Sequence, residues 1–542
     1  MPRSHALRAL ARLAAVHAAA DSEGVSAGRI RDEMSLSRRD FARGLLAASA
    51  TLPLLAGCSV GQSPAANKRV AIIGAGIAGL TAALRLQDAG IASTVYESSS
   101  RIGGRMHSEW SYWNDRQHTE WCGAMIDTQH VTMHALARRF HLPLGDTYSG
   151  LKADDRDTAF LDGHYYPMPE ADRDFAAIYP ILKSQLAAMP ATPMYSNMTA
   201  AGHRLDQTSM AAWIDRYVPG GLGSRLGKLI KEAYRNEYGR EIEEQSSLNL
   251  VCMLGIQRHF ERDGKMSVLG YSDQRFYIAA GNQRLPLAIA AALPAGTVQF
   301  GHRMVSIKKL PGGLYELQFD NNGATVKETY ERVVIAIPFI VLRGLDYSSA
   351  GFDAAKHRAI QELGYGYHTK LHVQFDGRPW RKPGSWPGPT TGQIWTTLPF
   401  QSSVDFSLGQ AGPSGIIERF TGAGAALIDT PPMPYARIGD SDAVKRQVKH
   451  FFEMLDEIWP GCSKQFNGKA TFGNAQADPN ILASYSCWLT GQYSTIAGTE
   501  GLRQGNVHFA GEHTSVEHQG FMEGGAEAGV RVAAEILSDL KS

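Results

Sequence analysis

Three glycines and one acidic residue near residue 80 have a spacing that suits phosphate binding. They form a Gly-x-Gly-x-x-Gly pattern at Gly74, Gly76 and Gly79, and Glu97 follows. Glycines at this spacing allow a tight turn and let the backbone approach a pyrophosphate. An acid about 20 residues further on can accept hydrogen bonds from ribose hydroxyls. The chemistry indicated is the binding of a dinucleotide.

The elements that must position these residues are readable on both sides of the glycines. Residues 70–73 are an apolar run that suits a buried parallel strand. Residues 80–86 have helical periodicity, and the start of such a helix offers N–H groups and a positive dipole to an anion. Residues 93–96 form a second apolar run that ends at Glu97. Strand, glycine turn, helix, strand and acid together predict a dinucleotide-binding unit.

The segment after Glu97 distinguishes between dinucleotides. Residues 101–105 read Arg-Ile-Gly-Gly-Arg, where two glycines let the chain pass close to phosphates and Arg105 offers a guanidinium fork. A surface ion pair is the alternative for Arg105. Here the chain resembles the flavin amine oxidase family, which includes monoamine, polyamine and L-amino-acid oxidases and carries Arg-x-Gly-Gly-Arg after its ribose acid. The resemblance implies FAD as the cofactor.

Further motifs follow in the order of that family. Residues 120–126 resemble its flavin-facing Gly-Ala loop, and residues 277–286 resemble the return to the FAD domain, with Ala280 where a second glycine is usual. Residues 298–300 and 304–307 resemble the strand pair beside the adenine. Residues 332–338 and 506–512 resemble two further strands, and residues 520–526 open a helix over 527–537. The resemblance implies these cofactor contacts: Gly74, Gly76, Ala78, Gly79, Glu97, Ser98, Gly104, Arg105, Gly123, Ala124, Met125, Ile126, Val305, Gly511, Glu512, Phe521 and Met522.

The resemblance also implies three catalytic residues. Lys370 lies in an alternating segment that predicts a strand, and it matches the family lysine that holds a water against flavin N5 and assists reoxidation by oxygen. Trp488 and Phe521 match the two aromatic walls that align the substrate amine in a water-poor pocket. A solvated edge lysine and ordinary core aromatics are the alternatives.

The five cysteines contain no Cys-x-x-Cys pair, so neither a zinc site nor a thioredoxin-like motif is indicated. Cys122, Cys252 and Cys462 are interpreted as scattered buried thiols. Cys487 precedes the first expected aromatic wall, where some monoamine oxidases attach flavin covalently. Tyr485-Ser486 replaces the paired glycines of those enzymes, which argues against the same attachment here.

The substrate is left open between L-amino acids and amines. Venom-type L-amino-acid oxidases carry an arginine for the substrate carboxylate where this chain has Ile126. Residues 235–238, Arg-Asn-Glu-Tyr, are interpreted as a solvated helix end, with a polar wall of the substrate tunnel as the alternative. The predicted activity is an oxidase that uses oxygen and releases hydrogen peroxide, ammonia and a keto acid or aldehyde. The alternatives are a dehydrogenase that passes electrons to a periplasmic carrier and a non-catalytic flavin-binding subunit.

The N-terminal segment predicts export. Residues 37–41, Ser-Arg-Arg-Asp-Phe, precede an apolar stretch over 44–56 and resemble a twin-arginine signal peptide. Leu-Ala-Gly-Cys at 55–58 resembles a lipobox, so Cys58 is a candidate lipid anchor, with ordinary cleavage nearby as the alternative. A periplasmic or membrane-anchored lipoprotein is expected. The 54 basic and 53 acidic residues, a net charge of +1, argue against a nucleic-acid surface.

The predicted fold is α/β, with a Rossmann-like FAD-binding domain and a discontinuous α+β substrate domain. Residues 1–66 are assigned to a leader, signal peptide and linker. The FAD-binding domain is assigned to residues 67–128, 268–345 and 483–542, and the substrate domain to residues 129–267 (helical) and 346–482. A homodimer is left open, and no metal site is predicted.

Overall fold

The computed structural model describes residues 70–152, 155–256 and 266–541. The twin-arginine element, Cys58 and the assigned leader lie outside the described residues. Helices are α3 (Ile77–Asp88), α4 (Val131–Arg139), α5 (Met168–Ala176), α6 (Tyr179–Ala187), α7 (Ala200–Asp206), α8 (Met210–Tyr217), α9 (Arg225–Tyr238), α10 (Ser247–Leu254), α11 (Arg284–Ala292), α12 (Phe339–Leu342), α13 (Ala354–Glu362), α14 (Asp442–Ile458) and α15 (Met522–Lys541).

Strands are β1 (Val70–Ile73), β2 (Ser93–Tyr96), β3 (Ser108–Glu109), β4 (Thr119–Glu120), β5 (Leu144–Asp146), β6 (Arg156–Leu161), β7 (His164–Tyr165), β8 (Phe276–Ile278), β9 (Val298–Gln299), β10 (His302–Lys309), β11 (Tyr315–Asn321), β12 (Ala324–Tyr330), β13 (Arg332–Ile335), β14 (His368–Phe375), β15 (Thr390–Thr396), β16 (Ser402–Asp405), β17 (Gly415–Gly422), β18 (Tyr435–Arg437), β19 (Phe466–Asn474) and β20 (Val507–Phe509). No helix in the described ranges combines the length and apolarity that crossing a membrane would need.

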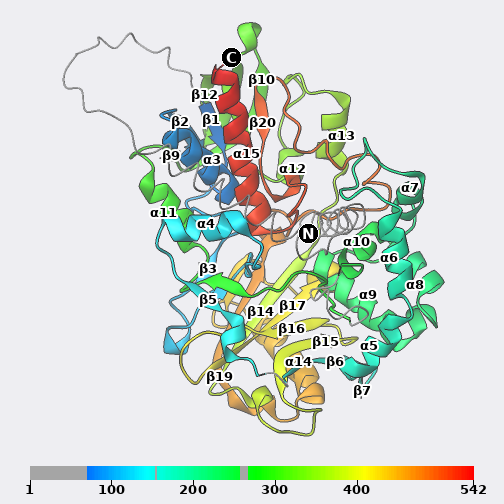
Figure 1. Ribbon diagram of the computed structural model, residues 1–542. Helices are drawn as coiled ribbons and strands as arrows, with labels where there is room; N and C mark the ends of the chain where they lie inside the picture. The colour runs from blue at the N-terminus through cyan, green and yellow to red at the C-terminus, as the bar shows by residue number, and fades with distance from the viewer. Residues whose placement is uncertain (1–69, 153–154, 257–265, 542) are drawn as a thin grey trace, which may run out of the picture.

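A five-stranded parallel sheet in the order β20-β13-β1-β2-β9 carries the predicted glycine turn. Every residue of β1 is buried, as expected for a parallel strand that is covered on both faces. Helices α3 and α15, from the two ends of the described chain, lie side by side against this sheet (Figure 1). The predicted dinucleotide-binding fold is confirmed.

Glycine is required where β1 turns into α3. Gly74 has φ of +106°, a left-handed value that favours glycine. A Cβ on Gly79 would lie 2.1 Å from the carbonyl oxygen of Gly74, so only glycine lets α3 pack this close to the turn. A glycine also allows close packing between α15 and α3, because a Cβ on Gly529 would lie 2.4 Å from the carbonyl oxygen of Ala78.

An eight-stranded sheet forms the other half of the molecule, in the order β18-β19-β14-β17-β16-β15-β6-β7. Its pairs are antiparallel except for β15 with β6. All eight residues of β14 are buried, because β17 and β19 flank the strand and α14 packs beneath it. The predicted strand around Lys370 is β14, so the lysine lies in the middle of the sheet rather than on a solvated edge.

Helices α5 to α10 gather on one side of this sheet (Figure 1). In α9, the buried residues Leu226, Leu229, Ile230 and Ala233 recur at helical spacing and form one apolar face. Ser224 caps the helix by accepting from the Gly227 N–H, and Gly239, with φ of +63°, ends it. The last turn of the helix reaches β17.

Two details differ from the sequence predictions, and a third shows how a departure from the family pattern is accommodated. The expected strand pair over 298–307 is split between two sheets, because after a turn at Gly301 β10 pairs with β11 in a separate sheet of the order β10-β11-β12. The last helix begins at Met522, five residues before the predicted start. Ala280 has φ of +62°, so a position where the family usually has glycine retains the left-handed conformation. The strands of the parallel sheet come from residues 70–96, 298–335 and 507–509, while the domain limits themselves stay a prediction.

Candidate functional site

One cavity of about 370 Å³ connects the two sheets. It runs from the glycine turn, past the N-terminus of α15, to β14 and β17. Of the predicted site residues, the following line it: Gly74, Gly76, Ala78, Glu97, Ser98, Gly104, Arg105, Gly123, Ala124, Met125, Lys370, Gly511, Glu512, Phe521 and Met522. Residues that are distant in the sequence are thus brought to one surface.

Glu97 closes the glycine end of this cavity. One carboxylate oxygen accepts from the Ala75 N–H at 2.9 Å, and the other accepts from the N–H and hydroxyl of Ser99 at 2.8 and 2.7 Å. Ser98 donates to the Asn480 side chain at 2.7 Å. The carboxylate is therefore fixed against the turn at the cavity wall, in the place expected for a ribose contact.

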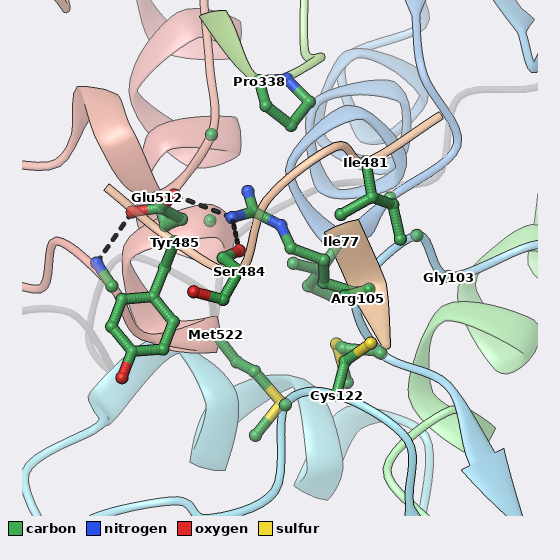
Figure 2. A pocket seen from close by; sticks show the side chains of 18 of the residues that line it. Ile77, Gly103, Arg105, Cys122, Pro338, Ile481, Ser484, Tyr485, Glu512 and Met522 are labelled. Carbon is green, nitrogen blue, oxygen red and sulfur yellow. Dashed lines mark hydrogen bonds and ion pairs between the residues drawn. The ribbon is translucent and has the colours of Figure 1, made fainter. Parts of the chain in front are cut away.

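Arg105 and Glu512 form an ion pair inside the cavity (Figure 2). Arg105 donates to Glu512 at 2.8 Å and to the Ser484 carbonyl at 2.6 Å. Glu512 also accepts from the Ser486 hydroxyl at 2.7 Å and the Gly520 N–H at 2.8 Å. Burial alone would raise the pKa of Glu512, but the Arg105 charge and these bonds hold it below its ordinary value. Arg105 is thus an internal partner rather than a surface ion pair.

The Gly-Ala loop lies against the start of α15. A Cβ on Gly123 would lie 3.1 Å from Met522, and the Gly123 N–H donates to the Arg105 carbonyl at 2.9 Å. The Asn282 amide donates to the carbonyls of Gly123 and Ala124 at 3.1 and 2.6 Å and fixes the loop. The positive end of the α15 dipole therefore faces this part of the cavity.

Four predicted site residues do not line the cavity. Gly79 is a packing glycine between α3 and the turn, as described above. Ile126 is fully buried, and its backbone N–H and carbonyl pair with Phe276. Val305 lies at the irregularity of β10, and its neighbours His302, Arg303 and Met304 line the cavity instead.

Trp488 is the fourth. It is 3% exposed, and its ring lies 5.1 Å from that of Tyr493 in the core. Residues 484–487 pair with residues 364–366. Ser484, Tyr485 and Ser486 line the cavity, whereas Trp488 does not. Tyr485 is therefore the aromatic residue of this segment that reaches the cavity. Cys487 is fully buried and does not line the cavity.

The four cysteines of the described ranges form no disulfide. Cys252 and Cys462 are buried, as predicted, but Cys122 is half-buried and lines the cavity.

Lys370 lies in a polar cluster between β14 and β17. Its Nζ donates to Glu418 at 3.0 Å, and His372 donates to the same carboxylate oxygen at 2.8 Å. Burial would raise the pKa of Glu418, but the Lys370 charge and the His372 bond lower it. Glu120, fully buried nearby, has its pKa raised to about 8 by burial. Glu418, His372 and Glu120 escaped sequence reasoning, because their proximity depends on strand register.

Aromatic rings enclose the cavity beside this cluster. The His368 ring stacks on Phe420 at 4.6 Å and on Tyr485 at 4.8 Å, and all three line the cavity. Burial lowers the pKa of His368 to about 3, so this ring is neutral at physiological pH. Phe521 lines the cavity from the loop that precedes α15. This part of the cavity therefore combines aromatic rings with a neutral histidine.

The last turn of α9 also reaches the cavity, which corrects the interpretation of residues 235–238 as a solvated helix end. Asn236 and Tyr238 are buried, and Asn236, Glu237 and Tyr238 all line the cavity. The Arg235 side chain points elsewhere, to Glu232 and Glu241 at 2.8 and 2.7 Å.

The glycine turn on a parallel sheet, joined by one cavity to a buried lysine on a second sheet, defines a flavin-dependent oxidoreductase. A family model described as flavin containing amine oxidoreductase matches residues 77–537, and the chain belongs to this family. The cofactor is FAD.

Relatives and solved structures agree with this assignment. YobN of Bacillus subtilis (strain 168), provisionally named an L-amino-acid oxidase, is 24% identical over 89% of this chain and 96% of its own length. Polyamine oxidase 4 of Oryza sativa subsp. japonica is 22% identical over 86% of this chain and 88% of its own. Cyclohexylamine oxidase from Brevibacterium oxydans IH-35A has the same fold, with a TM-score of 0.71 at 17% identity over 88% of this chain and 99% of that chain. The predicted fold class is confirmed.

The residues present fit FAD. Gly76 has open space beside it, since a Cβ there would meet no described atom within 4 Å. The turn, the fixed Glu97 carboxylate and Arg105 offer the groups that a pyrophosphate and a ribose need. The opposite end of the cavity holds the dipole of α15 and Lys370, where the flavin ring would lie.

Proposed function

We propose that the protein is an FAD-dependent oxidase that oxidises the C–N bond of an amine and releases hydrogen peroxide, ammonia and an aldehyde. The observation that carries this proposal is the junction of the FAD-type cavity with a chamber that is lined by aromatic rings and contains Lys370. When bound, FAD supplies the acceptor for the hydride that leaves the substrate carbon.

The chain's own residues orient the substrate and exclude water. Tyr485 and Phe521 offer aromatic faces that attract and align an amine. The neutral His368, stacked behind Tyr485, keeps this wall apolar. Lys370 holds a positive charge where oxygen must accept electrons, which favours formation of peroxide.

Charges in the cavity favour amines over amino acids. The cavity-lining arginines are Arg101, Arg105 and Arg303. Arg101 donates to the Gly104 carbonyl and Arg105 to Glu512, and Arg303 lies on β10 near the glycine end. Lys370 pairs with Glu418. Among the lining residues, no unpaired cation in the aromatic chamber is available for an α-carboxylate.

The Lys370–Glu418 pair favours a second candidate, a dehydrogenase with the same first half-reaction. A carboxylate 3.0 Å from Nζ offsets the lysine charge and weakens its effect on oxygen. Reduced enzyme would then deliver electrons to another carrier.

A two-part assay on the FAD-loaded protein separates these functions. Bleaching of the flavin by amines under nitrogen, followed by rapid recolouring and peroxide on admission of air, is the expected result. Bleaching without peroxide would identify the dehydrogenase. Bleaching by amino acids alone would overturn the amine assignment. Absence of bleaching with any amine or amino acid would indicate a non-catalytic flavin-binding subunit.

We also propose export by the twin-arginine route and lipid attachment at Cys58, on the sequence features of residues 37–58. Mass spectrometry of the mature N-terminus tests both. A diacylglyceryl-modified Cys58 is expected, and an unmodified N-terminus elsewhere would contradict the anchor. A homodimer stays a prediction.

A further inference from the structure

The last turn of α9 carries a carboxylate to the cavity in a fixed position. Asn236 anchors this turn, because its amide donates to the Phe420 carbonyl at 2.7 Å and accepts from the Ser402 hydroxyl at 3.0 Å. The Glu237 carbonyl accepts a hydrogen bond from the Tyr485 hydroxyl. Figure 2 shows this hydroxyl pointing away from the Arg105–Glu512 pair. Glu237 therefore lies beside the aromatic wall, in the substrate part of the cavity.

The Glu237 side chain differs from the acids on either side of it. Glu232 and Glu241 both pair with Arg235. Glu237 lines the cavity instead, and its carboxylate has no hydrogen bond or ion pair with any described residue. Burial raises its pKa to about 7. A carboxylate in such surroundings is stabilised when a cation pairs with it, because an unpaired buried charge is costly.

The charges around the chamber sum to an unmatched negative charge. Lys370 and Glu418 offset one another, so ionised Glu237 is left over. The reacting amine has to be neutral to release a hydride, and it cannot balance this charge. A second amine in the same molecule stays protonated at neutral pH, since alkyl ammonium groups lose their proton only near pH 10.

We propose that Glu237 binds a distal ammonium group of the substrate, so that the substrate class is a diamine or a longer polyamine. This inference rests on the proposed amine oxidase function and specifies its substrate. The reacting amine lies against Tyr485, and the carbon chain spans the aromatic chamber to Glu237. Only the proximal C–N bond is oxidised, and the distal nitrogen leaves unchanged.

The test uses binding rather than turnover. The diamine 2,5-diamino-2,5-dimethylhexane and the monoamine 2-amino-2-methylhexane have no hydrogen on the carbons that bear nitrogen, so neither can be oxidised. Dissociation constants are measured by calorimetry on FAD-loaded wild type, Glu237→Gln and the control Glu243→Gln. Glu243 is exposed and follows α9. The melting temperature and flavin content of each variant verify folding.

The wild type is expected to bind the diamine more tightly than the monoamine. Glu237→Gln should lower that preference about 10- to 100-fold, the loss typical of one hydrogen bond to a charged group. Glu237→Asp should restore part of it, and Glu243→Gln should leave it unchanged. An equal affinity of wild type for both probes, or an unchanged preference in Glu237→Gln, overturns the inference. Failure of the bleaching assay with every amine would instead refute the proposed function.

Discussion

The two ends of the cavity use charge differently. At the cofactor end, Arg105 and Glu512 are paired with each other and with backbone groups, and Glu97 is held by three donors. At the substrate end, Lys370 is paired, but Glu237 has no partner among the described residues. The cofactor end is preorganised for a ligand that stays bound, while the substrate end keeps an unpaired charge for a ligand that binds and dissociates in each turnover.

The largest expected effect tests the geometry of the cofactor end. Gly79→Ala places a Cβ 2.1 Å from a backbone oxygen that cannot move without opening the turn. Overpacking of this kind costs about 1–3 kcal/mol or more, and the purified protein should lose its flavin and melt at a lower temperature. Gly76→Ala is the matched control, because open space lies beside that position. It should retain the melting temperature of the apoprotein. Equal melting temperatures for the two variants would contradict the packing role of Gly79.

Lys370→Met tests the substrate end. Loss of the charge should slow the reoxidation of the reduced flavin by oxygen about 100-fold, as removal of one electrostatic group often does. Bleaching by substrate should change far less. Stopped-flow absorbance measures the two half-reactions separately, and equal losses in both would remove the role proposed for this lysine.

A smaller effect of opposite sign is expected at the partner of Lys370. Glu418→Gln removes the negative charge that offsets the charge of Lys370, so reoxidation of the reduced flavin by oxygen should become about 10-fold faster. The same stopped-flow traces measure this rate. His372→Gln serves as a control, since it changes a hydrogen bond to Glu418 without removing the negative charge. Slower recolouring in Glu418→Gln would show that the carboxylate mainly positions the lysine.

The smallest effect is a pH dependence. Burial, with a contribution from the charge of Asp127, raises the pKa of Glu237 to about 7. The protonated, neutral form predominates below that pH and the binding form above it. The affinity of wild type for the non-oxidisable diamine, divided by that of Glu237→Gln, should therefore rise about tenfold between pH 6 and pH 8, because the ionisation of the diamine itself affects both proteins equally. A profile with the same slope in the variant would assign the titration to another group.

The same contrast between the two ends explains what the sequence could predict. The glycine turn, Glu97 and Arg105 lie within one short segment, where spacing alone determines geometry. The family motifs predict Ile126, Val305 and Trp488 as site residues, but none of the three lines the cavity. Ile126 pairs through its backbone with Phe276, Val305 lies at an irregularity of β10, and Trp488 packs in the core.

The substrate end depends on contacts between distant segments. Glu418 meets Lys370 only through the register of β14 with β17, which no local pattern encodes. Glu237 reaches the cavity because α9 continues one turn beyond its apolar periodicity. Tyr485 reaches the cavity, whereas Trp488 packs against Tyr493 in the core, and the sequence does not show which of the two does so. Such residues become predictable only when the pairing of strands and helices is known.

The ion pair between Arg105 and Glu512 also has a consequence for biosynthesis. Glu512 follows Arg105 by 407 residues in the chain, and α15, which comes after it, packs directly on α3. A nascent chain therefore lacks one wall of the FAD site until α15 has been made. Cofactor loading must follow synthesis of this helix, and a chain truncated before residue 512 should not retain flavin. Bound flavin thus reports that both distant segments of the site have been made and have folded together.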